Sequence, residues 1–383
     1  MLTVLGVVVI LLAGVVGSGY LYLRYEWNKV KKVDCTSCAV AASSIAPFNV
    51  LIIGSDTRAG NSGQAAESFG TTQEAGGQRS DTIKILHVDP QAGTADLLSI
   101  PRDTWVEMSG LPESSGLSGP EKINTAFNDG PLPLVQTIEN SFGIPINHFI
   151  VVDFNGLINA VQSVGGISMD VPYPVRDCSD SGCGTDNSGL DIATTGCQVL
   201  NGNQTLALAR SRFFEYDDPA EGGWTADPTG DIGRIQRQDE IIEAMVDKVE
   251  STYDPLTLRS FLDSVVHDIT VDSQLSPGLL FDLANRYHAF SGSKLATYTL
   301  PTTSGQNYGG DVQIVQEPEA QQMLYQFLGT SPNTPTTPPL DVNSDPLEVP
   351  TVSGSTTSTT SGTAATSTPP VTTTVPPFDP VPC

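Results

Sequence analysis

The sequence predicts an α/β fold in which helices cover both faces of a central sheet. Two observations lead to this prediction. Short apolar runs of strand length alternate with stretches of helical periodicity, and a chain of 383 residues is long enough to bury a large core. The expected strands are residues 48–54, 83–88, 95–100, 148–153 and 167–171. The expected helices lie close to residues 132–142, 155–164, 204–210, 234–250, 277–287 and 318–328.

Residues 1–23 are expected to form a transmembrane anchor, followed by a juxtamembrane linker over residues 24–46. The segment 2–23 is uncharged and mostly apolar, and it has about the length that crosses a bilayer. A cleaved signal peptide is the alternative, because the run GVVGSGY offers small residues at a cut site. The retained anchor is favoured because the apolar run is long and no basic region precedes it.

The orientation of this anchor follows from features further along the chain. Four basic residues come directly after the span, and the positive-inside rule alone would keep the rest of the chain in the cytoplasm. The cysteines and the C-terminal tail, described below, both indicate an extracellular location, and we give them more weight than that rule. We therefore expect a single-pass protein of the cell membrane whose folded part is on the extracytoplasmic side.

The six cysteines indicate disulfides formed in an oxidising compartment. Three of them share a stretch rich in Gly, Ser and Asp, two follow the span, and one ends the chain; they are Cys178, Cys183 and Cys197, Cys35 and Cys38, and Cys383. A metal site explains them less well, because no histidine or second CxxC completes a tetrahedral set. We expect one bridge within residues 178–197. The CTSC at 35–38 could instead be a redox pair, which the lack of a following helical pattern disfavours.

The C-terminal part, residues 331–383, is rich in Pro, Thr and Ser and poor in large apolar residues. Such a segment cannot bury enough surface to offset the entropy lost on ordering, so we expect a disordered extracellular tail. The folded domain is therefore expected to span residues 47–330.

The charge of the chain excludes several classes of function. There are 43 acidic and 18 basic residues, which gives a net charge of −25. Nucleic-acid binding needs an excess of Lys and Arg, and an anionic membrane surface would repel this chain except at local contacts. The four histidines show no metal-binding spacing. Neither a GxxxxGK[ST] nor a GxSxG motif is present, which argues against a nucleotide hydrolase and a serine esterase.

Acidic residues lie at the ends of three expected strands, where α/β sheets collect ligands. Asp56 follows the strand 48–54, Asp81 precedes the next strand, and Asp103 follows the strand 95–100. Asp56 and Asp81 each lie two residues from an arginine, and carboxylates of this kind suit Mg²⁺ bound together with phosphate oxygens. For either aspartate alone, the capping of a turn or helix would be the simpler interpretation.

Seven of the eleven arginines are concentrated in five short motifs. They are Arg58, Arg79, Arg102, Arg210, Arg212, Arg234 and Arg237. In a helix, Arg234 and Gln238 share a face, and Arg237 is expected to flank the same patch. Guanidinium groups bind phosphate through paired N–H donors and keep their charge. Salt bridges could explain one or two of the seven, but the clustering favours a multiply charged phosphate with its metal.

Six motifs in order resemble the LytR-CpsA-Psr family. They are NVLIIGSDTR, RSDTIKILHVDP, LLSIPRDTWV, EKINTAF, LNGNQTLALARSRF and DIGRIQRQ, and the resemblance covers about residues 49–249. It implies a three-layer α/β/α sandwich around a central mixed sheet, with an apolar pocket for a prenyl chain. It also implies a membrane-anchored enzyme that moves a glycopolymer from a polyprenyl diphosphate carrier to peptidoglycan and leaves a phosphodiester link.

The resemblance implies roles for residues of this chain. Asp56 and Asp81 would hold Mg²⁺, with Mn²⁺ as the alternative, against the diphosphate. The positions matching those around the phosphates are Arg79, Arg102, Lys122, Arg210, Arg212, Arg234 and Gln238, to which reasoning from the residues adds Arg58 and Arg237. Arg102, Asp103 and Arg234 are expected to be catalytic. Asp103 would either orient or deprotonate the attacking sugar hydroxyl, or hold Arg102 in place.

Two other functions fit the same residues. A hydrolase would use water instead of peptidoglycan as the acceptor, and a non-catalytic receptor would bind polyprenyl phosphates without chemistry. The chain also departs from the family pattern. The segment 59–78 is longer than usual, NDG replaces a glycine pair after EKINTAF, and the tail stands in place of a second C-terminal domain.

Overall fold

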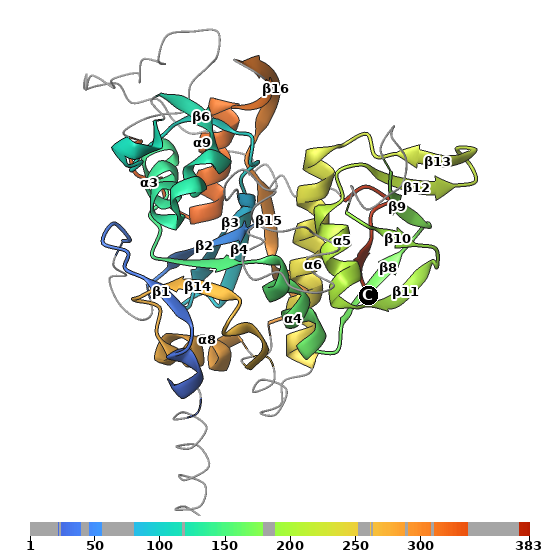
Figure 1. Cartoon of the computed structure of the whole chain (residues 1–383), viewed down its shortest axis with the longest axis horizontal. Coiled ribbons are helices and arrows are strands. Elements are labelled where there is room, and N and C mark those ends of the chain that lie inside the picture. The colour runs from blue at the N-terminus through green and yellow to red at the C-terminus, as the bar shows by residue number, and fades with distance from the viewer. Residues whose placement is uncertain are drawn as a thin grey trace, which may run out of the picture.

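A mixed seven-stranded sheet forms the centre of the computed structural model (Figure 1). The structure describes residues 22, 24–39, 46–55, 80–116, 119–178, 188–251, 261, 263–287, 290–307, 310–335 and 375–383. The strands in spatial order are β1 (Lys31–Val33), β14 (Ile269–Asp272), β7 (His148–Val152), β2 (Phe48–Ser55), β3 (Ser80–Asp89), β4 (Thr94–Ser99) and β15 (Ala296–Thr299). Strands β2, β3 and β4 are antiparallel neighbours, whereas β7 runs parallel to β2 and β15 parallel to β4. The predicted α/β class with a central mixed sheet is confirmed.

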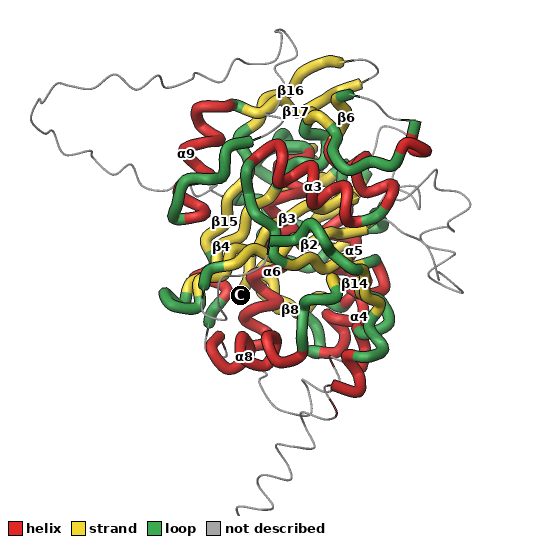
Figure 2. The backbone as a smooth tube through the Cα atoms, turned by 90° about the vertical axis from the view of Figure 1, so that its left-hand side faces the viewer, coloured by secondary structure: helices red, strands yellow, loops and turns green. Residues whose placement is uncertain are grey.

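The two faces of this sheet bury different sets of side chains, because residues alternate across a strand. On β3, Ile83 and Ile85 are buried against α3 (Pro131–Phe142) and α9 (Glu317–Leu328). Lys84, Leu86 and Val88 point to the other face, where α6 (Asp231–Ser251) and α8 (Pro277–Tyr287) lie. Figure 2 shows the strands between these two groups of helices.

Smaller sheets lie on the far side of α6, at the right of Figure 1. One contains β10 (Asp191–Ile192), β9 (Val175–Asp177), β12 (Phe214–Asp218) and β13 (Gly223–Ala226), and another contains β11 (Gly196–Leu200), β8 (Ile167–Val171) and β18 (Val381–Pro382). Helices α4 (Phe154–Ser163) and α5 (Gly202–Arg210) pack beside them. A second apolar cluster joins these sheets to α5 and α6. One side of helix α6 therefore faces the central sheet, and another side packs against the smaller sheets.

Short elements complete the described part of the chain. The hairpin β5 (Trp105–Glu107) and β6 (Pro120–Lys122) follows β4 and flanks the 3₁₀ segment η1 (Glu113–Ser115); the segment η2 (Ile123–Asp129) precedes α3. The segment η3 (Gly292–Lys294) precedes β15, and the hairpin β16 (Thr302–Asn307) and β17 (Gly310–Val315) precedes α9.

Helix ends carry the expected local signals. Asn201 and Gln204 form a capping box at the start of α5, and the Asp153 side chain accepts a hydrogen bond from the backbone N–H of Gly156 at the start of α4. Helix α3 begins at Pro131 and ends before Gly143, whose φ of 66° is accessible to glycine at little cost. The caps of α4 and α5 fix the first turns of two helices that border the cavity.

None of the helices within the described residues has the length and apolarity needed to span a membrane. Apart from Tyr22, the predicted anchor at residues 1–23 lies outside the described residues.

The end of the chain corrects the prediction of a disordered tail over residues 331–383. Strand β18 pairs with β8, and the Phe378 ring stacks on Tyr216 with 4.3 Å between ring centroids. Asp379 is 2% exposed and forms an ion pair with Arg237. The physical reason is composition: the final residues, PPFDPVPC, contain an aromatic ring, a carboxylate and a cysteine that all find partners on the domain. Residues 336–374 of the predicted tail lie outside the described residues.

The disulfides confirm an oxidised protein and include one long-range bridge that the sequence did not predict. Cys35 and Cys38 form a bridge, and both residues are buried, which disfavours the alternative of a redox pair because such cysteines need access. Cys197 is bonded to Cys383. Cys178 is also disulfide-bonded, which agrees with the expected bridge within residues 178–197. The pattern of cysteines within one stretch could not reveal the partner of Cys197, which is 186 residues away.

Candidate functional site

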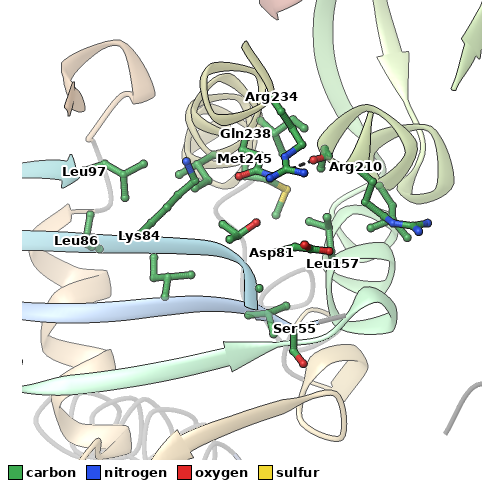
Figure 3. Close-up of a pocket in the computed structure, with 18 of the residues that line it drawn as sticks. Ser55, Asp81, Lys84, Leu86, Leu97, Leu157, Arg210, Arg234, Gln238 and Met245 are labelled. Carbon is green, nitrogen blue, oxygen red and sulfur yellow. Dashed lines mark hydrogen bonds between the residues drawn. The ribbon is translucent and has the colours of Figure 1, made fainter. Parts of the chain in front are cut away.

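A cavity of about 1330 Å³ lies between the central sheet and helices α4, α5 and α6 (Figure 3). Apolar side chains form its inner wall; among them are Ile52, Leu86, Leu97, Leu157, Ile242 and Met245. Most of the charged residues of the cavity lie near the start of β3 and the end of α5. We call Asp81, Arg102, Arg212 and Arg234 the mouth cluster.

Asp81 is the centre of the mouth cluster. Its Oδ1 accepts hydrogen bonds from Nη1 of Arg102 at 2.6 Å and from Nη2 of Arg212 at 3.0 Å. Burial raises the pKa of the Asp81 carboxyl, but the guanidinium groups of Arg102, Arg212 and Arg234 outweigh burial and hold that pKa below its usual value. Asp81 is therefore an ionised carboxylate among three cations.

Arg234 adds positive charge that its surroundings do not fully neutralise. It projects from the first turn of α6, is 2% exposed, and pairs with Asp231 at 2.7 Å. Burial lowers the pKa of Arg234 to about 10, and the neighbouring Arg102 and Arg212 act in the same direction against Asp231. The group stays charged at neutral pH, and a bound anion would stabilise it.

Two buried nitrogens at the mouth have no hydrogen-bond acceptor within the described part of the chain. They are the Nε atoms of Arg102 and Arg234. Buried donors are normally satisfied, so a missing acceptor points to a ligand. A phosphate is the ligand whose oxygens match paired guanidinium donors best.

Asp103 lies between two cations beside the mouth. Its Oδ2 is 3.5 Å from Nε of Arg102, a contact too long for a hydrogen bond, and its Oδ1 is 3.0 Å from Nζ of Lys122. The backbone explains why these groups meet, because Asn124 N–H donates to Arg102 C=O and Trp105 is paired with Lys122 across the β5–β6 hairpin. Both carboxylate oxygens of Asp103 thus face positive charge.

Gln238 and Arg210 lie where α5 meets α6. The Gln238 amide donates to the C=O of Ala209 at 2.9 Å, and the Arg210 guanidinium stacks 4.5 Å from the centre of the Phe154 ring. In Figure 3, Arg234 and Gln238 project from α6 towards the side where Asp81 lies, whereas Arg210 points away from them. Both residues line the cavity.

The structure therefore gathers most of the predicted residues that it describes. Those lining the cavity are Asp81, Arg102, Asp103, Lys122, Arg210, Arg212, Arg234 and Gln238. Asp56, Arg58 and Arg79, together with the long segment 59–78, lie outside the described residues.

Arg237 corrects the prediction that it flanks the phosphate patch. Its Nη1 pairs with Asp227 at 2.7 Å and with Asp379 at 2.9 Å, and its guanidinium stacks 4.1 Å from the centre of the Phe214 ring. It is 1% exposed, does not line the cavity, and lies against Phe214 of β12 and Asp379 beside β18. The charge of Arg237 is satisfied there by two carboxylates.

The donor set at the mouth fits a magnesium ion bound together with a phosphate ligand. No group of three or more His, Cys, Asp or Glu residues gathers in a metal-binding arrangement within the ranges that the structure describes. Mg²⁺ commonly uses only one or two carboxylates and takes its other ligands from phosphates and water. The ionised carboxylate of Asp81 can be one of these.

A buried ion pair in the cavity wall was missed by the sequence reasoning. Lys84 Nζ lies 2.5 Å from Oδ1 of Asp239 and 2.7 Å from Oγ of Ser99, and Lys84 is 1% exposed. The available signal was the lysine itself, which interrupts the apolar face of SDTIKILHV. No local pattern could name Asp239 as the partner, since 155 residues separate it from Lys84.

Comparisons with known proteins agree with this geometry. The LytR_cpsA_psr family profile matches residues 23–328. The polyisoprenyl-teichoic acid–peptidoglycan teichoic acid transferase TagV of Bacillus subtilis is 30% identical over 297 residues, covering 76% of this chain and 67% of that protein. The probable cell wall biosynthesis protein LcpB of Corynebacterium glutamicum is 32% identical over 322 residues, covering 82% and 69%.

A solved structure shows the same fold. The LytR-Csp2A-Psr enzyme from Actinomyces oris superposes with a TM-score of 0.59 at 22% identity, over 80% of this chain and 97% of that one.

Proposed function

The chain belongs to the LytR_cpsA_psr family, and we propose that it transfers a glycopolymer from a polyprenyl diphosphate carrier to peptidoglycan, forming a phosphodiester link. The names of its relatives, a teichoic acid transferase and a cell wall biosynthesis protein, support a transferase of this kind. The observation that carries the proposal is the mouth cluster at the opening of a cavity with an apolar inner wall. A lipid diphosphate has the same division into a charged head and an apolar chain.

Binding would follow this division. The prenyl chain would lie against the apolar wall, where each buried CH₂ contributes about 0.8 kcal/mol. The diphosphate would lie at the mouth and accept hydrogen bonds from Arg102, Arg212 and Arg234, including the Nε donors that lack an acceptor in the described structure. A hydrogen bond to a charged group contributes about 1.5–3 kcal/mol.

The reaction is a phosphoryl transfer. The oxygen of a peptidoglycan hydroxyl would form a bond to the phosphorus that bears the glycan. The bond from this phosphorus to the bridging oxygen would break, and polyprenyl monophosphate would leave with the electron pair. Arg102 and Arg234 would stabilise the negative charge that spreads over the phosphate oxygens.

Asp81 and Asp56 would hold Mg²⁺, with Mn²⁺ as the alternative, and the ion would neutralise part of the diphosphate charge. Asp103 would hold Arg102 and Lys122 in position, a role supported by its contacts to both cations. The hydroxyl proton would pass to Asp103 or to water. Lys122, Arg210 and Gln238 would complete the phosphate site, with Arg58 and Arg79 as further expected contacts.

We propose that the domain works outside the cytoplasmic membrane, anchored by residues 1–23. The Cys35–Cys38 and Cys197–Cys383 disulfides support this location, because disulfides persist in oxidising compartments. The lipid-linked substrate and the peptidoglycan acceptor both meet at that surface.

The test uses the full-length protein, a lipid-linked glycan, and peptidoglycan added or omitted. Arg102→Ala and Arg234→Ala should each reduce transfer by about 10³-fold or more. Arg286→Ala, at an exposed position on α8, is the matched control and should transfer normally. Near-normal transfer by either mouth variant contradicts the site, and release of the lipid at the same rate without acceptor identifies a hydrolase.

A further inference from the structure

Exposed aromatic side chains lead away from the cavity mouth along the outer face of the sheet β10–β9–β12–β13. Phe213 lines the cavity directly after Arg212, and 51% of it is exposed. Trp224 on β13 is 40% exposed. We call Phe213, Arg176, Glu215 and Trp224 the outer strip.

The backbone of Phe213 is fixed although its ring is exposed. Its N–H donates to Oδ1 of Asp177 at 2.8 Å, and its C=O accepts from the N–H of Cys178 at 2.9 Å. The next residue, Phe214, is 2% exposed within the apolar cluster. Because neighbouring residues of an extended chain point to opposite faces, burial of Phe214 turns Phe213 outwards.

The strand register places the rest of the outer strip on the same face. Glu215 is opposite Arg176, and Asp217 is opposite Trp224. Arg176 Nε pairs with Glu215 Oε2 at 2.7 Å, and its guanidinium lies 4.0 Å from the centre of the Trp224 ring. From strand geometry the Cα atoms of Phe213 and Trp224 are about 14 Å apart.

We propose that the outer strip binds the first sugar residues of the glycan carried by the lipid diphosphate. This inference rests on the proposed function. The sugars are covalently joined to the phosphate, so they must leave the cavity at the mouth, where Phe213 lies. Aromatic rings offer a rigid surface for the apolar face of a sugar ring, while Arg176 and Glu215 offer a donor and an acceptor for its hydroxyls.

The charge of this region selects the kind of sugar. Strand β12 and the turn after it carry Glu215, Asp217, Asp218 and Glu221. Such a surface repels phosphate groups, so a polymer rich in phosphodiesters would be disfavoured at this position. The strip therefore fits uncharged sugars next to the diphosphate.

The other large hydrophobic residue that is both exposed and part of the described cavity lining does not compete with Phe213. Val249 is 40% exposed, but it lies 15 residues beyond Arg234 on α6, about 22 Å along the helix axis. That position is at the lipid end of the cavity. Phe213 is the exposed ring beside the phosphates.

The experiment compares binding of two lipids to the full-length protein. One is a polyprenyl diphosphate with an uncharged oligosaccharide, and the other is the same lipid without sugars. Phe213→Ala and Trp224→Ala should each weaken binding of the first lipid roughly tenfold and leave binding of the second unchanged. Phe213→Tyr, which keeps the ring, should bind both lipids as the unmodified protein does. Tyr325→Ala, which removes an exposed ring on α9, is the matched control.

The outcomes separate this inference from the proposed function. If Phe213→Ala binds the oligosaccharide lipid as tightly as the unmodified protein does, the outer strip does not bind sugars. The same conclusion follows if the variant loses affinity equally for both lipids. A loss of affinity for a peptidoglycan fragment alone also overturns it, because the strip would then serve the acceptor. If the sugar-dependent loss is found but no variant or unmodified protein transfers glycan, the strip holds and the proposed transfer fails.

Discussion

Replacing Asp239 with asparagine removes the negative charge from the buried ion pair in the cavity wall and leaves its shape intact. Lys84 would remain between the sheet and α6 with Ser99 Oγ at 2.7 Å and the C=O of Ile235 at 3.4 Å as its remaining contacts among the described residues. Burial lowers the pKa of Lys84, and Asp239 is the group that opposes this effect. The substitution therefore removes the main reason for the lysine to stay charged.

Two estimates of the cost agree. Breaking a buried ion pair by removing one partner costs about 3–5 kcal/mol. If the lysine instead loses its proton at pH 7, the cost is limited to about 1.4 kcal/mol for each of the roughly 3.5 pH units below its ordinary pKa of 10.5, or about 5 kcal/mol. Asp239→Asn should therefore lower the free energy of unfolding by about 3–5 kcal/mol, a large part of a typical total of about 5–15 kcal/mol.

The sign of the pH dependence follows from the lowered pKa. A lysine held neutral in the folded state is penalised while the unfolded chain is protonated, so the penalty should shrink as the pH rises towards 10.5. Urea unfolding followed by circular dichroism at pH 7 and pH 9.5 measures both effects. At pH 9.5 the variant should be only about 1–2 kcal/mol less stable than the unmodified protein.

A double variant provides the control. Lys84→Met with Asp239→Leu should recover most of the lost stability, because apolar groups of similar size replace the pair. Lys294→Met, at an exposed position, should have little effect. A loss below about 1 kcal/mol for Asp239→Asn at pH 7 would refute the argument that this pair is dry and charged.

Three further predictions concern the elements around the site. Gly202→Ala would place a Cβ 2.5 Å from the C=O of Ile158, so α5 must shift from α4 and thermal unfolding should show a loss of about 1–3 kcal/mol. Burial, aided by neighbouring carboxylates, raises the pKa of Glu240 to about 8, so its stabilising effect is present below pH 4.5 and is lost as the pH rises through 8. Glu240→Gln should therefore add on the order of 1 kcal/mol or more at pH 8.5 and almost nothing at pH 4, as denaturation at both pH values will show. Cys383→Ser opens the bridge to Cys197 and should cost about 2–5 kcal/mol in urea unfolding, whereas an unchanged midpoint would mean that β18 is held by its other contacts alone.

Local pattern was sufficient to predict the main elements of the fold. Residues 234–250 were expected as a helix and lie within α6, and residues 48–54 were expected as a strand and lie within β2. Both segments are long enough for their period to be read from the order of apolar residues. The strands β9, β10 and β18 have only two or three residues each, so no period could identify them.

The site was predictable where it depends on strand ends and not where it depends on distant partners. Asp81 and Arg102 lie at the ends of neighbouring strands, so the α/β topology alone brings them together. Lys84 and Asp239 lie in the middle of their elements, and a charged residue there is usually expected to be exposed. Their pairing depends on how α6 lies across the sheet, which no short stretch of sequence encodes.

The geometry of helix α6 explains why Arg237, one of the two arginines in the motif DIGRIQRQ, does not lie at the site. Successive residues of a helix turn by about 100°, so Gln238 lies about 40° from Arg234 in one direction and Arg237 about 60° in the other. The cavity is on the side of Gln238, followed by Ile242 and Met245. The side of Arg237 faces Asp227 and Asp379, two carboxylates that come from outside α6. The spacing i and i+3 brings two side chains close together on one helix, but when the helix lies between two cores, the i+3 residue can belong to the other one.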